Sequence, residues 1–175
     1  MNLPNKLTIA RVVAVPFFIV AFIMKLYLIA FLIFVLASLT DLLDGQIARK
    51  HNLVTNFGKI MDPLADKILV YSAFCLFVEN GTVPSWMLIV ILAREFAIAG
   101  MRTVAASEGI VIAAGMSGKI KTVLQMITVI VLILGHGFYQ EILMPVGNVL
   151  LWLSIIATVY SGIEYIVKNK KVFSI

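Results

Sequence analysis

The sequence predicts an all-α integral membrane protein with six transmembrane helices and both termini in the cytoplasm. Three observations predict this class: the composition, the spacing of the apolar segments and the distribution of Lys and Arg. Of the 175 residues, 62% are hydrophobic and 13% charged, and the mean hydropathy is +1.06, which is outside the range of ordinary soluble domains. Because a spanning helix needs about 20 apolar residues, this length holds six short-looped helices and no separate soluble domain. We therefore expect residues 1–175 to form a single transmembrane domain.

Six apolar segments follow one another along the chain. They cover residues 7–24, 26–49, 60–78, 86–106, 119–135 and 146–167. The first begins among basic residues, as a signal peptide does, but no small-residue cleavage site precedes the second segment, so we expect a retained helix. Residues 79–84, Glu-Asn-Gly-Thr-Val-Pro, form the clearest turn.

The basic residues indicate the orientation of the helices. If the N-terminus is cytoplasmic, most Lys and Arg lie at or near cytoplasmic helix ends, whereas Lys25 is clearly outside. An even number of helices then places both termini in the cytoplasm. The net charge of +5 comes without a basic run interleaved with aromatic residues, so anionic headgroups of membrane lipids and phosphorylated substrates explain it better than nucleic acid does.

Four aspartates gather at the cytoplasmic ends of the second and third segments. Asp41 and Asp44 are three positions apart, and Asp62 and Asp66 are four apart, so each pair shares a helix face. A charged side chain costs about 2.5–3.5 kcal/mol near the centre of a spanning helix. A cluster of four such side chains therefore indicates a function. The connecting loop is short, so we expect two antiparallel neighbours that turn both pairs toward one cavity. Four carboxylates without adjacent His or Cys suit Mg²⁺ or Mn²⁺.

Small and basic residues accompany the first aspartate pair. Gly45 and Ala48 would let a nucleotide or pyrophosphate approach the helix backbone, and Arg49 could contact phosphate or offset carboxylate charge. The alternative is a solvated acidic helix end, with Asp62 as a cap before Pro63.

The aspartates form a long pattern of fixed spacing, D-x2-D-G-x2-A-R-x8-G-x3-D-x3-D. This pattern matches, without a departure, the signature of the CDP-alcohol phosphotransferase family, which the chain resembles over most of its length. The resemblance implies a six-helix core, a homodimer, and a bacterial cytoplasmic membrane location with the active site facing the cytoplasm.

The same resemblance implies roles for individual residues. All four aspartates, Asp41, Asp44, Asp62 and Asp66, would bind two Mg²⁺ or Mn²⁺ ions, and Asp66 would also act as general base. The cytidine diphosphate part of CDP-diacylglycerol would contact Asn5, Thr8, Gly45, Ala48, Arg49 and Thr55.

Three further strings, residues 2–11, 94–102 and 118–126, resemble family members that use sn-glycerol 3-phosphate as the acceptor. The implied reaction is attack by its 1-hydroxyl on the β-phosphorus of CDP-diacylglycerol, which releases CMP and gives phosphatidylglycerophosphate. An acceptor that carries a phosphate calls for a basic subsite. Our candidates are Arg94, Arg102, Lys119 and Lys121.

Alternative interpretations exist for these basic residues and for the activity. Arg94 could pair with Glu95, and the other three could extend to the membrane surface. Lys67, beside Asp66, could contact phosphate or extend to the membrane surface in the same way. Within the family, the acceptor could be serine, inositol phosphate or a lipid. Outside it, an intramembrane prenyltransferase or a cation transporter would also place aspartates in a membrane.

Overall fold

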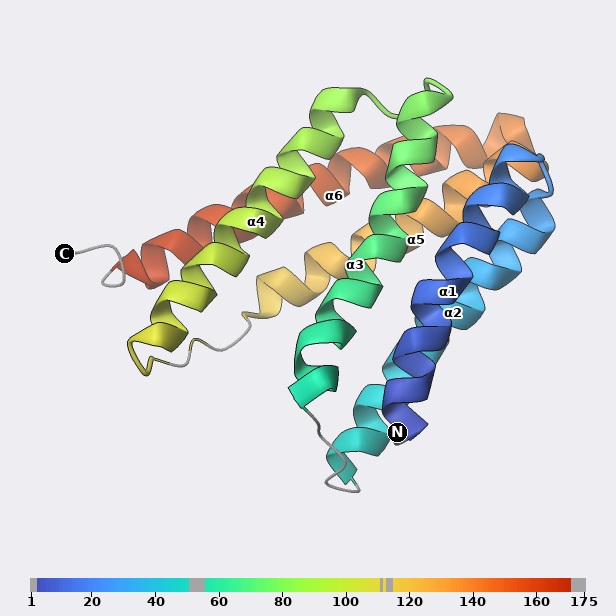
Figure 1. Ribbon diagram of the computed structural model, residues 1–175. Coiled ribbons are helices and arrows are strands. Elements are labelled where there is room, and N and C mark those ends of the chain that lie inside the picture. Colours follow the sequence, from blue (N-terminus) through green and yellow to red (C-terminus); the bar gives the residue numbers. More distant parts are fainter. Residues whose placement is uncertain (1–2, 51–55, 111, 113–114, 171–175) are drawn as a thin grey trace.

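The computed structural model describes residues 3–50, 56–110, 112 and 115–170, and over these residues it consists of six α-helices (Figure 1). They are α1 (Leu3–Ile23), α2 (Tyr27–Lys50), α3 (Asn56–Glu79), α4 (Ser85–Ser107), α5 (Met116–Gly137) and α6 (Gln140–Lys168). Some side chains within the helices lie outside this description, namely those of residues 3–4, 41–50, 56–60, 62–63 and 66. Each predicted segment coincides with one helix, with ends that differ by a few residues.

The turn between α3 and α4 is the one that the sequence predicts. The amide of Thr82 donates to the carbonyl of Phe77 at 2.8 Å, which closes the end of α3. Gly81 has a φ of +77°, a left-handed conformation that glycine adopts without steric cost. Pro84 is extended, with φ −60° and ψ 135°, immediately before α4. Local turn chemistry therefore sets this boundary.

The helices pack in two groups that meet at α5. Helix α1 packs along both α2 and α3, while α5 packs along α6 and α6 also contacts α4. Helices α2 and α3 run antiparallel, as predicted, but each packs mainly against α1 rather than against the other (Figure 1). The beginning of α1 lies near the end of α2 and the beginning of α3, whereas α6 ends beside the end of α4 (Figure 1).

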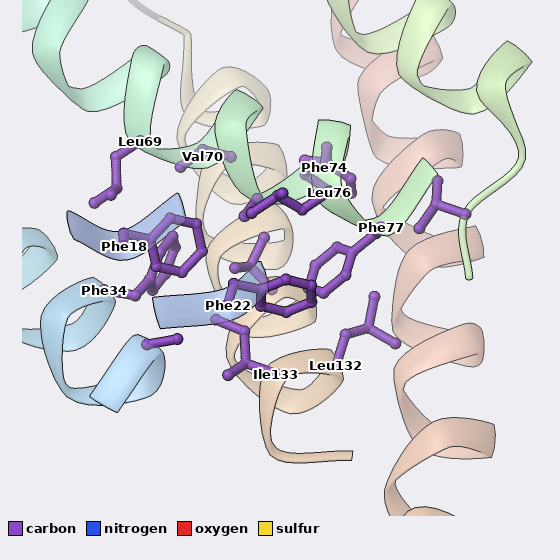
Figure 2. Close-up of a cluster of buried hydrophobic side chains, with 14 of the residues drawn as sticks. Phe18, Phe22, Phe34, Leu69, Val70, Phe74, Leu76, Phe77, Leu132 and Ile133 are labelled. Carbon is purple, nitrogen blue, oxygen red and sulfur yellow. The ribbon is translucent and has the colours of Figure 1, made fainter. Parts of the chain in front are cut away.

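An aromatic core holds α1 in this position. Phe18 is fully buried, and its ring lies 6.3 Å from that of Phe22 and 5.9 Å from that of Phe34, measured between centroids. Figure 2 shows this core, in which residues of α1, α2, α3 and α5 face one another. Since lipid is as apolar as these side chains, close packing rather than removal from water is what favours their association. The core thereby fixes α2 and α3 on either side of α1.

The outer surface of the bundle is apolar. Large side chains such as Phe17, Phe96 and Ile156 are more than 60% exposed, as expected for a surface in contact with lipid. Within the part of the chain that the structure describes, three stretches are long and apolar enough to cross a membrane: Asn5–Ile23, Met116–Gly137 and Gln140–Lys168. These features indicate a multi-pass membrane protein.

Helix α4 has the length of a span but an unusual charge content. Every 18-residue window of Ser85–Ser107 includes Arg94, Glu95 and Arg102. Charged residues at such positions are costly and commonly mark functional sites. The structure gives two of them a common environment, described below.

Candidate active site

The four aspartates lie on the helices that the sequence predicts for them. The described backbone places Asp41 and Asp44 near the C-terminal end of α2, and Asp62 and Asp66 in the N-terminal half of α3. Helical spacing puts each pair on one face of its helix. Their side chains lie outside the described residues, so the meeting of the four carboxylates in one cavity stays a prediction.

The residues expected to contact the cytidine diphosphate are only partly described. Gly45, Ala48 and Arg49 follow the first aspartate pair on α2, with side chains outside the described set, and Thr55 lies outside the described residues altogether. Asn5 and Thr8 are described, and both are buried on α1.

Helix α1 directs a polar face into the bundle. Asn5, Thr8 and Arg11 recur every three residues and are all buried, with Arg11 only 2% exposed. The Nε of Arg11 donates to the carbonyl oxygen of Ala37 at 3.3 Å. Ala37 lies one helical turn before Asp41. The polar face of α1 therefore contacts the part of α2 that precedes the first aspartate pair. From the sequence, Arg11 entered the predicted topology and the string 2–11 without a contact in the site; its spacing from Thr8 was the available signal for a place on this face.

A cluster of charges lies around Glu95, which is only 5% exposed; in it Arg94 and Lys121 are largely buried, whereas the side chain of Lys67 is 39% exposed. The Glu95 cluster consists of Lys67 from α3, Arg94 and Glu95 from α4, and Lys121 from α5. Lys67 Nζ lies 3.1 Å from Oε2 of Glu95, and Arg94 Nη1 donates to Oε1 at 2.8 Å. Lys121 Nζ also donates to Oε1. One carboxylate thus faces three cations from three helices, which leaves a formal excess of two positive charges.

Two glycines make room for the side chain of Arg94. A Cβ atom added to Gly162 on α6 would lie 3.1 Å from Cγ of Arg94, and one added to Gly118 on α5 would lie 3.4 Å from Nη2. Arg94 therefore extends between α5 and α6. Among the described residues, its buried Nε has no hydrogen-bond partner. The buried hydroxyl of Tyr71 is near enough to interact with Glu95, although not in hydrogen-bonding geometry.

The other two predicted acceptor residues have different surroundings. Arg102 Nε donates to the hydroxyl of Tyr165 at 3.0 Å, and its guanidinium lies 5.4 Å from the centre of that ring. Lys119 is exposed, two residues from the buried Lys121. The structure thus brings Arg94 and Lys121 together through Glu95, with the pairing to Glu95 that the sequence left open. It places Arg102 and Lys119 nearer the surface.

The Glu95 cluster adjoins the second aspartate pair along α3. Lys67 directly follows Asp66 on α3, so the two positions are separated by about 100° around the helix and about 1.5 Å along it. The ion pair between Lys67 and Glu95 connects α3 with α4. The predicted metal ligand Asp66 and one cation of the Glu95 cluster are therefore neighbours on α3. From the sequence alone, two roles were possible for Lys67: contact with phosphate, or extension to the membrane surface.

The donor chemistry of the aspartate positions fits a hard divalent cation, which prefers carboxylate oxygens. Among the side chains that the structure describes, which do not include the four aspartates, no group of three or more His, Cys, Asp or Glu could hold an ion. The aspartate pairs of α2 and α3 remain the predicted ligands.

Comparison with known protein families identifies the family of this chain. The sequence profile of the CDP-alcohol phosphatidyltransferase family matches residues 1–160. The chain belongs to this family. The matched part includes the four aspartates and the whole Glu95 cluster and ends within α6. Membership in the CDP-alcohol phosphatidyltransferases favours a transferase over a cation transporter or a prenyltransferase.

Individual relatives match over nearly their full length. A CDP-diacylglycerol–glycerol-3-phosphate 3-phosphatidyltransferase of Bacillus subtilis is 43% identical, over 96% of this chain and 95% of the relative. The Rickettsia felis protein of the same name is 41% identical, over 98% and 97%. A probable phosphatidylglycerophosphate synthase of Mycobacterium tuberculosis is 33% identical, over 95% and 81%.

Proposed function

We propose that this CDP-alcohol phosphatidyltransferase transfers the phosphatidyl group of CDP-diacylglycerol to sn-glycerol 3-phosphate, giving phosphatidylglycerophosphate and CMP for phospholipid biosynthesis. The observation that carries the proposal is the near-full-length similarity to transferases whose names specify glycerol 3-phosphate as the acceptor. The cationic Glu95 cluster, in which Arg94 and Lys121 are largely buried, adds a structural reason for a phosphorylated acceptor.

The charge of the Glu95 cluster suits the phosphate of the acceptor. A phosphate monoester has a second pKa of about 6 and is therefore close to a dianion at neutral pH. The cluster has a formal excess of two positive charges, and Lys and Arg retain N–H donors beyond those that bind Glu95. We assign Lys67, Arg94 and Lys121 to the acceptor phosphate, with Arg102 and Lys119 at the outer side of the subsite.

The second aspartate pair would act at the other end of the same acceptor. Asp66 would accept the proton of the 1-hydroxyl while that oxygen forms a bond to the β-phosphorus. The bond from this phosphorus to the bridging oxygen breaks, and CMP leaves with the electron pair. Because Asp66 and Lys67 are adjacent on α3, a three-carbon acceptor can meet the base and the phosphate subsite together.

The first aspartate pair and the polar face of α1 would bind the donor. We assign Asp41, Asp44, Asp62 and Asp66 to two Mg²⁺ or Mn²⁺ ions, and Asn5, Thr8, Gly45, Ala48, Arg49 and Thr55 to the cytidine diphosphate. When bound, the ions supply positive charge that stabilises the diphosphate and its leaving oxygen. The buried Asn5 and Thr8 beside α2 support this side of the site.

The membrane arrangement that we propose has six spans, both termini and the active site in the cytoplasm, and a homodimer in the bacterial cytoplasmic membrane. The apolar exterior and the basic helix ends support the six-span topology. The ionisable residues of α3 and α4 then serve the site rather than disqualify these helices as spans.

An acceptor assay tests the proposed reaction. Purified protein receives labelled CDP-diacylglycerol and, in parallel, sn-glycerol 3-phosphate, glycerol, serine or inositol phosphate. We expect CMP release with sn-glycerol 3-phosphate, little with glycerol, which lacks the phosphate, and loss of turnover in EDTA that added Mg²⁺ or Mn²⁺ restores. Turnover with serine but not with sn-glycerol 3-phosphate would overturn the acceptor assignment, and full activity in EDTA would overturn the metal requirement.

A further inference from the structure

We infer that Glu95 is a positioning residue for the acceptor phosphate: its carboxylate holds Lys67, Arg94 and Lys121 together as one anion-binding group. The inference rests on the proposed function, because it concerns the phosphate of that acceptor. Glu95 itself, as an anion, would not contact the phosphate but would act through the three cations.

The division of contacts on Glu95 supports this role. Oε1 accepts from both Arg94 and Lys121, while Oε2 faces Lys67. Two nitrogens bound to one oxygen, with a third on the other oxygen, are confined to a small volume. Without the carboxylate, three like charges from three helices would repel one another, and most strongly where burial lowers the local dielectric.

The number of cations distinguishes this cluster from a structural ion pair. Among the described residues, one carboxylate faces three cations, so two positive charges have no described counter-charge. For buried side chains such as Arg94 and Lys121 this is costly unless an anion binds there. Arg94 and Lys121 are nearly fully buried, with side chains 12% and 5% exposed. Arg94 also retains a buried Nε without a partner among the described residues. A dianionic ligand satisfies both the surplus charge and the unused donors.

The position of each cation adds a second reason. Lys67, Arg94 and Lys121 come from α3, α4 and α5, and α3 makes few direct contacts with either α4 or α5. The carboxylate of Glu95 is therefore a link between helices that otherwise touch little. A shift of this carboxylate should move the three cations apart, and should weaken binding of the phosphate before it affects the chemical step.

Two substitutions test the inference. Glu95→Gln removes the charge, whereas Glu95→Asp keeps the charge and withdraws the carboxylate by one methylene. We expect Glu95→Gln to raise the KM for sn-glycerol 3-phosphate by about tenfold or more, and Glu95→Asp to raise it severalfold. The KM for CDP-diacylglycerol should stay within about twofold in both variants, because the donor contacts other residues. Glu164→Gln is the matched control, since it breaks a peripheral ion pair, from Lys168 Nζ to Oε1 at 2.5 Å, and should leave both KM values unchanged.

The outcomes separate positioning from a purely structural role. If Glu95 only compensates charge, Glu95→Asp will behave as wild type, and Glu95→Gln will lower thermal stability and raise both KM values together; either pattern would overturn the inference. Should Glu95→Gln fail to fold, Glu95→Asp still decides through its KM for the acceptor. If the wild-type protein does not use sn-glycerol 3-phosphate, the proposed function fails first. If it does, and both Glu95 variants keep their acceptor KM, the inference alone fails.

Discussion

Replacing Asp66 with Asn should lower kcat by about a thousandfold or more while the protein remains folded. A positioned general base contributes about 10²–10⁴-fold to a rate, and Asn has nearly the same shape as Asp but accepts no proton at neutral pH. The substitution would also weaken a metal ligand. The measurement is CMP release from CDP-diacylglycerol with saturating sn-glycerol 3-phosphate, together with a melting curve in detergent.

A metal titration separates the two roles of Asp66. If the residue acts as the base, the rate of Asp66→Asn stays low at every concentration of Mn²⁺. If it is only a ligand, high Mn²⁺ restores much of the rate, because mass action compensates for weaker binding. A folded Asp66→Asn variant with a rate within tenfold of wild type at limiting Mn²⁺ would contradict both assignments.

Replacing Arg94 with Ala should raise the KM for sn-glycerol 3-phosphate by about tenfold to a hundredfold. Hydrogen bonds to charged groups contribute about 1.5–3 kcal/mol, and about 1.4 kcal/mol corresponds to tenfold in affinity. The KM for CDP-diacylglycerol should change little. Steady-state kinetics with each substrate varied in turn provides both values.

Arg102→Ala is the matched control for Arg94. It removes the same residue type from the same helix, but the guanidinium of Arg102 binds Tyr165 near the surface rather than Glu95. We expect its acceptor KM to change by less than about threefold, since its contribution is partly screened by solvent. An equal or larger effect than that of Arg94→Ala would place the phosphate at the outer side of the bundle and would contradict the assignment to the Glu95 cluster.

Hydropathy predicted the helices well because lipid imposes a simple requirement on each span. The segments 7–24 and 86–106, for example, became Leu3–Ile23 and Ser85–Ser107. The additional residues at these helix ends include polar ones, such as Asn5 and Ser107, which hydropathy does not count toward a span. The turn at residues 79–84 was predictable because glycine and proline determine the backbone conformation locally.

The packing of the helices could not be predicted from hydropathy in the same way. Short loops suggested that α2 and α3 would be close neighbours, yet each packs mainly on α1. The reason lies in the aromatic residues of α1, such as Phe18 and Phe22, which bury their rings between the other two helices. An apolar segment shows that it enters the membrane, but not which of its faces meets a neighbour.

The basic subsite was predicted in part. Arg94 and Lys121 were two of the four candidates from the sequence, and pairing of Arg94 with Glu95 was the alternative left open. Nothing in the sequence joined Lys67 to Lys121, since their contact runs through a carboxylate on a third helix. Likewise, the partner of Arg102 is Tyr165, 63 positions away. Side-chain pairs across helices depend on the packing that hydropathy does not encode.

The most direct test is an experimental structure of the protein with Mn²⁺, sn-glycerol 3-phosphate and a non-reactive analogue of CDP-diacylglycerol. The anomalous signal of manganese locates the ions, and the density of the acceptor locates its phosphate. We predict manganese at Asp41, Asp44, Asp62 and Asp66, and the phosphate against Lys67, Arg94 and Lys121, with its 1-hydroxyl directed toward Asp66. A phosphate bound at Arg102 and Lys119, or manganese away from the aspartates, would contradict this arrangement.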